Sequence, residues 1–201
     1  MNYSIVKKLK NIDLILLSTF LYTIFYTSTY PIIYKTIMST IHKNFISINQ
    51  IVACCSIILF NSIWNKHSNK LFKYFPALCA LETVCTLIVT IYISTSKASI
   101  TSFYILDTLI FVIVTRNIIC GKSRLKALKY STPSKREKFD NNNSSYASLA
   151  TIIGASISIA LKMDFITMLW IAAFGNCIDN VLYMIIYKNL IKKDKNKIKK
   201  H

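Results

Sequence analysis

Acidic residues are scarce in this sequence, and the imbalance of charge is large. Its 201 residues include eight Asp and Glu against 25 Lys and Arg, which gives a net charge of +17 at pH 7. A chain this basic could bind nucleic acid, but its basic residues lie in clusters between long apolar blocks. Such clustering is typical of the loops of membrane proteins, so we expect no nucleic-acid partner.

Metal-binding motifs are lacking as well. The six cysteines lie in or at the edges of apolar blocks, with no C-x-x-C pair and no Cys/His spacing typical of zinc. We interpret them as small buried thiols, and we predict no cofactor and no metal site. An intramembrane cysteine peptidase would need His67 beside Cys79, but a helix would separate these two by about 18 Å. The sequence therefore predicts no enzyme.

Hydrophobic residues make up 53% of the chain, and most of them fall into six long blocks. A helix of about 20 apolar residues is long enough to cross the hydrocarbon core of a bilayer. We therefore predict an all-α integral membrane protein with six transmembrane helices, and a membrane domain over residues 12–190. The six blocks span residues 12–34, 47–64, 72–95, 99–119, 144–162 and 165–188.

The basic residues also predict a topology. The N-terminal segment 1–11, the regions after the second and fourth blocks, and the end of the chain hold 21 of the 25 Lys and Arg. Lys and Arg are enriched in cytoplasmic loops. We therefore expect the plasma (cell) membrane, both termini in the cytoplasm, a long basic cytoplasmic loop over 121–143 and a disordered basic tail over 191–201. The first block is too long for the apolar region of a signal peptide, and no A-x-A-like site follows it.

Glycine occurs only three times, so close helix packing must use other small residues too. Ala150, Gly154 and Ser158 are spaced four apart in the fifth block. Stripes of small residues at this spacing let helix backbones approach closely in a membrane. We expect the fifth helix to pack tightly against a neighbour.

Three acids lie deep inside the apolar blocks, away from their ends: Glu82, Asp107 and Asp179. An ionisable group at this depth costs at least about 2.5 kcal/mol and usually faces the interior of a helix bundle. Arg116 follows Asp107 by nine residues, which puts the two on opposite helix faces. With no lysine at mid-depth, the acids are expected to be protonated, to face water or to meet a cation. The alternative is neutral carboxyl groups hydrogen-bonded to neighbouring Ser, Thr and Asn.

Other polar side chains accompany these acids and favour a wet interior. Tyr22 and Tyr26 lie too deep in the first block to act as interfacial anchors. Asn180 shares a helix face with Asp179, because the sixth block carries polar residues three and four apart. We therefore assign Glu82, Asp107, Asp179, Tyr22, Tyr26 and Asn180 to a predicted pathway for a solute or proton.

The segment NSIWNKHSNK at residues 61–70 resembles the loop motif of the major facilitator superfamily. Lys66 and Lys70 match the basic positions of the motif, and Asn65 stands where the family has aspartate. The passage from Arg116 to Ser158 is similar to the passage between the fourth and fifth helices of that family. Together these similarities cover nearly the whole chain, which resembles the amino-terminal half of a twelve-span member.

This resemblance implies a fold, a gating loop and a set of cavity-lining residues. Asn65, Lys66, Lys70 and Arg116 would belong to the gating loop. The first, second, fourth and fifth helices usually border the cavity in this family. The resemblance therefore implies that Tyr22, Tyr26 and Asp107 line the cavity, and that Glu82 and Asp179 are less central.

The sequence thus favours a half-size membrane transporter that moves a small cationic or amphipathic solute coupled to protons. Alternating access needs two halves that rock about a midplane site. We therefore expect a dimer with a second copy or with another membrane half, alongside the lipid bilayer and a small-molecule solute as partners. The alternative is a non-transporting membrane protein with an immunity, regulatory or assembly role and a transporter-like half fold.

Overall fold

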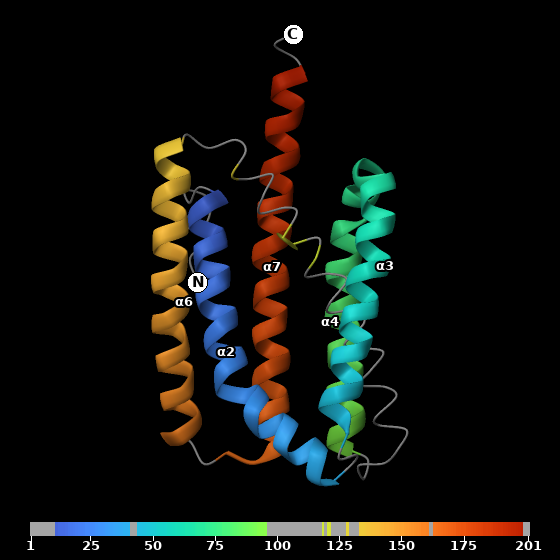
Figure 1. The fold of residues 1–201 in the computed structure, drawn as a ribbon, viewed down its shortest axis with the longest axis vertical. Coiled ribbons are helices and arrows are strands. Elements are labelled where there is room, and N and C mark those ends of the chain that lie inside the picture. Colours follow the sequence, from blue (N-terminus) through green and yellow to red (C-terminus); the bar gives the residue numbers. More distant parts are fainter. Residues whose placement is uncertain are drawn as a thin grey trace.

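The computed structural model describes residues 11–40, 44–95, 118, 120–121, 128, 133–160 and 163–198. Five long helices account for nearly all of them, and this part of the chain contains no strand (Figure 1). The helices are α2 (Asn11–Thr40), α3 (Phe45–Lys73), α4 (Phe75–Thr95), α6 (Pro133–Ala160) and α7 (Phe165–Ile198). They cover five of the six predicted apolar blocks. The block 99–119 falls almost entirely outside the described residues.

Among the described residues, three helices are long and apolar enough to cross a membrane. These candidate spans are Asn11–Ile33 in α2, Phe75–Thr95 in α4 and Phe165–Lys192 in α7. The apolar stretch of α3 is shorter, Gln50–Ile63, and α6 begins with polar residues over 133–145. The prediction of an all-helical protein with membrane-length apolar helices is confirmed at this coarser level.

Two helices extend beyond the apolar blocks that the sequence outlined. α6 begins at Pro133, so the second half of the predicted loop 121–143 is helical. α7 continues to Ile198, so the prediction of a disordered tail after Leu190 is wrong for residues 191–198. Neither extension contains glycine, and proline occurs only at the first position of α6, where it is well tolerated. Lysine is also a good helix former.

The helices are arranged around α7. α2 packs against both α6 and α7, α4 packs against the other side of α7, and α3 makes only slight contact with α2 and α4. In Figure 1 the order across the molecule is α6, α2, α7 and then the pair α3 and α4. α2 bends in its second half, where Pro31 cannot donate a backbone hydrogen bond.

Two apolar clusters form the core, one toward each end of the bundle. The first joins Leu14, Phe75 and Ile186, and Phe75 packs edge-on against Tyr183 with ring centroids 6.3 Å apart. The second joins Ile33, Val89 and Met168 at the opposite ends of the same helices. α2, α4 and α7 each contribute to both clusters, so burial of apolar surface fixes these three helices relative to one another.

The expected close approach of the fifth block is confirmed at Gly154. A Cβ atom on Gly154 would lie 2.7 Å from the backbone oxygen of Ile24 and would overlap the hydroxyl of Thr27. Ala150, one turn earlier, is fully buried. The backbones of α2 and α6 are therefore in direct contact at this level. Gly175 of α7 faces the ring of Phe25 in the same way.

Candidate functional site: a buried polar layer

A layer of polar side chains lies between the two apolar clusters. We call it the polar layer. It consists of Ser18 of α2, Glu82, Thr83 and Thr86 of α4, and Asn176, Asp179 and Asn180 of α7. Thr83 is half-buried, and the other six are buried. Ser18, Glu82 and Asp179 each lie at least seven residues from both ends of a candidate span, which is at least about 10 Å along the helix.

α7 supplies the central face of this layer. Asn176, Asp179 and Asn180 are spaced three and four apart, so they share one helix face. Ser18 of α2 donates a short hydrogen bond to Oδ1 of Asp179. Asn180 donates a 3.0 Å hydrogen bond from Nδ2 to Oγ1 of Thr83 on α4. α7 is thus tied to the helices on both of its sides by polar contacts.

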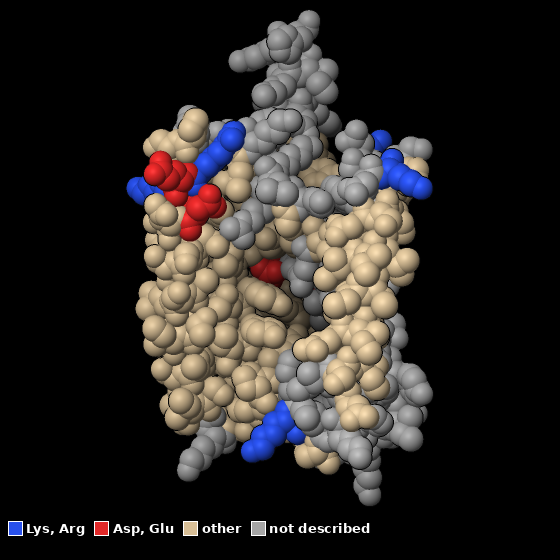
Figure 2. All heavy atoms as spheres, viewed as in Figure 1, with Lys and Arg blue, Asp and Glu red and all other residues tan. Residues whose placement is uncertain are grey.

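α4 contributes the second acid of the polar layer. Glu82 has an exposed fraction of 2%, and Asp179 has one of 4%. Cys177 of α7 lies within electrostatic range of Glu82. Thr86, one turn beyond Glu82, is also buried, and its Oγ1 makes no hydrogen bond within the described part of the chain. Figure 2 shows an acidic side chain recessed in a hollow at the middle of the molecule.

The part of the polar layer that the sequence did not reveal consists mainly of hydroxyl groups. Ser18 and Thr83 were not assigned to the site, although they make the hydrogen bonds that link α7 to α2 and to α4 in this layer. The available signal is weak, because many Ser and Thr in these helices bond to a carbonyl of their own helix, as Thr29 does to Phe25. The one useful signal is that Thr83 directly follows Glu82 in the sequence, which could have indicated that Thr83 belongs to the polar layer.

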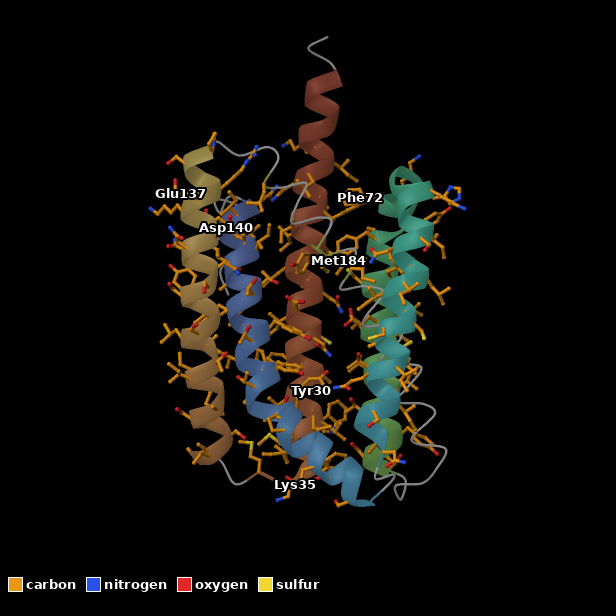
Figure 3. All side chains as sticks on the ribbon, in the orientation of Figure 1. Tyr30, Lys35, Phe72, Glu137, Asp140 and Met184 are labelled. Atoms are coloured by element: carbon orange, nitrogen blue, oxygen red, sulfur yellow. The ribbon has the colours of Figure 1, made fainter. Side chains whose placement is uncertain are left out.

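The predicted tyrosines lie on α2, in a separate arrangement. Tyr22, Tyr26 and Tyr30 form a continuous stack along the helix, with ring centroids 6.0 Å and 4.5 Å apart. Tyr26 has an exposed fraction of 40%. In Figure 3, Tyr30 lies in the middle of the bundle, between α2 and the pair α3 and α4. The side chains of Glu82 and Asp179 are thus more buried in the protein than the side chain of Tyr26.

The segment expected to be a gating loop is helical. α3 continues through residues 65–70 to Lys73, with a local break at His67, where φ is −132° and ψ is 25°. Lys66 is exposed, and the side chains of Asn65 and Lys70 are outside the described set. Without glycine or proline, the segment has no strong helix breaker. Asp107 and Arg116, the other predicted site residues, lie outside the described residues.

The chemistry open to the polar layer is that of oxygen ligands and mobile protons. Carboxylate, hydroxyl and amide oxygens can hold a proton or coordinate a hard cation. Within the described ranges, no three His, Cys, Asp or Glu side chains gather as metal ligands would.

One acid outside the layer has a structural role. Asp164 precedes α7 and caps its N-terminus, because its carboxylate accepts hydrogen bonds from the Thr167 hydroxyl and from the backbone N–H groups of Ile166 and Thr167. These bonds, the Thr167 hydroxyl first, hold the pKa of Asp164 below its ordinary value. The side chain is exposed.

The fold and the polar layer define the described part of the chain as an all-helical bundle with three membrane-length apolar helices and a polar interior. Comparison with known proteins adds no family to this description. The chain matches no protein-family model, no curated protein and no solved structure.

Proposed function

We propose that this protein is a half-size membrane carrier that moves a small cationic or amphipathic solute coupled to protons. The observation that carries the proposal is the polar layer. Two acids, Glu82 and Asp179, are buried about 10 Å or more inside candidate spans, together with side chains from three helices. Ionisable groups at such depth cost several kcal/mol, and they commonly mark the path of an ion or substrate.

The direction of the helices supports the proposed orientation, with both ends of the chain in the cytoplasm of a cell. α2, α4 and α6 begin at the end of the bundle where α3 and α7 finish (Figure 1). Lys66, Lys73, Lys188 and Lys192 lie toward that end on their helices, whereas Lys35 lies at the other end (Figure 3). Basic residues gather on the cytoplasmic side of membrane proteins.

The proposal includes half of a major facilitator fold, which makes an expectation about the helix contacts. Each six-helix half of that fold contains two three-helix repeats of inverted topology. The contacts of α2 with α6 and α7, and of α4 with α7, join the first block to the fifth and sixth and the third to the sixth. In such a fold the first, second and third blocks are equivalent to the fourth, fifth and sixth. The contacts of the first block with the fifth and sixth would therefore have counterparts, which are contacts of the fourth block with the second and third. If the repeats are present, we expect α3, which makes little contact with the described helices, to pack against the block 99–119.

A carrier of this size needs a second half. Alternating access works by rocking two halves about a site at the bilayer midplane, and the proposed six helices form only one of them. We propose a second copy of this chain, or another membrane half, as the partner. The lipid bilayer would surround both halves. Because residues 61–70 resemble the major facilitator motif, we propose them as the gating segment at the cytoplasmic end.

Flux in proteoliposomes tests the proposal. The probe is ethidium, a small amphipathic cation, and its entry is followed with and without a pH gradient. We expect the purified protein to accelerate entry when the gradient is present, and Glu82→Gln and Asp179→Asn to lower that rate at least about tenfold. Asp164→Asn is the matched control, since this acid is exposed and outside the spans; it should transport normally. Normal flux by both buried-acid variants would refute the assigned roles.

The second candidate is a non-transporting membrane protein with an immunity, regulatory or assembly role. It is favoured by how completely a single copy encloses the polar layer, where Glu82, Asp179 and Asn180 are at most 4% exposed. Polar contacts of this kind can hold membrane helices together without any flux. This candidate expects a monomer or hetero-complex in detergent and no ethidium flux above that of empty vesicles, and both are measured on the same preparation.

A further inference from the structure

Thr86 of α4 is a buried threonine whose hydroxyl group has no hydrogen-bond partner within the described part of the chain. Its exposed fraction is 4%. Many threonines in this bundle bond to a carbonyl of their own helix, as Thr83 does to Cys79 and Thr29 does to Phe25. Thr86 makes no such bond. Because a buried hydroxyl without a partner is costly and rare in native proteins, this group points to a partner of another kind.

The register between α4 and α7 sets what lies opposite Thr86. The two helices pack together in opposite directions (Figure 1), and the hydrogen bond from Asn180 to Thr83 fixes their relative height. Thr86 lies three residues further along α4, and Asn176 lies four residues back along α7, so their heights differ by about 1.5 Å. Asn176 shares the helix face of Asn180 and has an exposed fraction of 7%. A buried hydroxyl and a buried amide therefore lie at one level of the interface between α4 and α7.

The polar groups at this level match what an internal water molecule requires. A buried water typically makes about three hydrogen bonds to buried polar groups. Thr86 can both donate and accept, Asn176 can do the same through its amide, and Glu82 lies one turn before Thr86 on the same helix face. Figure 2 shows the bundle hollowed beside a recessed acidic side chain in this region. A water molecule needs only hydrogen-bonding groups, so its binding does not depend on the charge of Glu82 or of the basic residues elsewhere.

We propose that Thr86 and Asn176 bind an internal water molecule between α4 and α7. The Thr86 hydroxyl and the side-chain amide of Asn176 hold it by direct hydrogen bonds. The water joins the two helices one turn away from the bond between Asn180 and Thr83, and it lies beside Glu82, one of the two buried acids of the polar layer. The site rests on the packing of α4 against α7 and not on flux, so it holds equally for a carrier and for a protein that transports nothing.

Water-edited solid-state NMR tests the proposal on the full chain in lipid vesicles, with its Thr and Asn residues isotope-labelled. The measured quantity is the rate at which magnetisation passes from water to each side chain. Thr29 is the matched comparison, because it is fully buried and its hydroxyl is bonded to the Phe25 carbonyl. We expect Thr86 and Asn176 to receive magnetisation at least about threefold faster than Thr29, since a buried water is a lasting partner. Transfer to Thr86 as slow as transfer to Thr29 would overturn the proposal.

Thr86→Val keeps the shape of the side chain and removes the hydroxyl. With the water lost, transfer to Asn176 should fall at least about threefold. The melting temperature should fall by about 2–4 °C, because Asn176 loses a partner. Without a water in this place, the same change only removes an unpaired buried hydroxyl and should raise the melting temperature. Unchanged transfer to Asn176, or a higher melting temperature, contradicts the water site.

Two further variants separate hydrogen bonding from packing. Thr86→Ser keeps the hydroxyl and should preserve the transfer to Asn176. Thr95→Val removes an exposed hydroxyl of the same helix that is bonded to the Ile91 carbonyl, and it should change neither the transfer to Asn176 nor that to Thr86. If Thr86→Ser loses the transfer as fully as Thr86→Val does, the effect comes from packing and the proposal fails.

Discussion

Gly154 illustrates how much a single residue decides in this bundle. Adding a methyl group there would place it 2.7 Å from the Ile24 carbonyl oxygen and against the Thr27 hydroxyl. We expect Gly154→Ala to lower the free energy of unfolding by about 1–3 kcal/mol, the usual cost of overpacking. Melting in detergent, followed by size-exclusion chromatography, measures the effect.

The control for this substitution is Gly121→Ala. Gly121 is also helical, but a Cβ atom there would meet nothing within 4 Å. Alanine is a better helix former than glycine by about 1 kcal/mol, so this variant should melt at the wild-type temperature or slightly above. Equal melting temperatures for the two variants would mean that α2 and α6 do not touch at Gly154.

Asp164 gives the molecule a predictable response to pH. Hydrogen bonds from Thr167 and Ile166 lower its pKa in the folded state. Such a group stabilises the fold at pH values above its unfolded pKa, near 4, and that contribution is lost as the pH falls through the lower, folded value. Asn can cap the helix but does not titrate. The difference in melting temperature between wild type and Asp164→Asn should therefore be constant near neutral pH and shrink below about pH 4. A difference that grows on acidification would contradict this role.

At the scale of the helices, α7 joins α2 to α4. It carries the polar residues that contact α2 on one side and α4 on the other. The Ser18–Asp179 contact can be measured by a double-mutant cycle with Ser18→Ala and Asp179→Ala, using unfolding in a denaturing detergent. We expect a coupling free energy of about 0.6–2 kcal/mol, the range of hydrogen bonds between membrane helices.

A second cycle provides the comparison. Ser62 donates its hydroxyl hydrogen bond to the carbonyl of Ile58 in its own helix, α3. Ser62→Ala and Asp179→Ala should therefore be additive within about 0.5 kcal/mol. If the Ser18 cycle were equally additive, Ser18 and Asp179 would not be joined in the folded protein.

At the scale of the helices, hydropathy predicted the positions of the described helices well and their ends poorly. The five described helices coincide with apolar blocks because a long apolar run has few alternatives to a buried or membrane-embedded helix. The start of α6 at Pro133 and the end of α7 at Ile198 could not be predicted in this way. Both extensions are polar, and a polar segment without glycine or interior proline can be helix or loop depending on what it packs against.

The site was predictable only in part, for a related reason. The energetic cost of an acid in an apolar helix pointed to Glu82 and Asp179 without any structure. Their partners could not be found that way, because the choice of Ser18 and Thr83 depends on the register between α2, α4 and α7. That register is set by apolar packing at both ends of the bundle, around Phe75 and around Met168, and no local sequence pattern encodes it.

The molecule as a whole combines an apolar exterior with a polar interior. Large apolar side chains such as Ile58, Ile88 and Ile152 are more than half exposed on the isolated chain, and this is the expected surface of a protein solvated by lipid. The polar layer lies inside, between two apolar clusters. A carrier must let water or solute reach that layer, whereas a purely structural bundle keeps it dry.

Cysteine accessibility in the membrane measures this difference most directly. Cys177 is a native, half-buried reporter next to the polar layer, and Cys54 is exposed on the apolar stretch of α3. Two single-cysteine proteins, with the other five cysteines changed to serine, are exposed in vesicles to a membrane-impermeant thiol reagent. We expect that Cys177 reacts and that Cys54, facing lipid, does not. A Cys177 that stays unreactive from both sides of the membrane, in a protein that melts normally, would contradict a water-accessible polar layer.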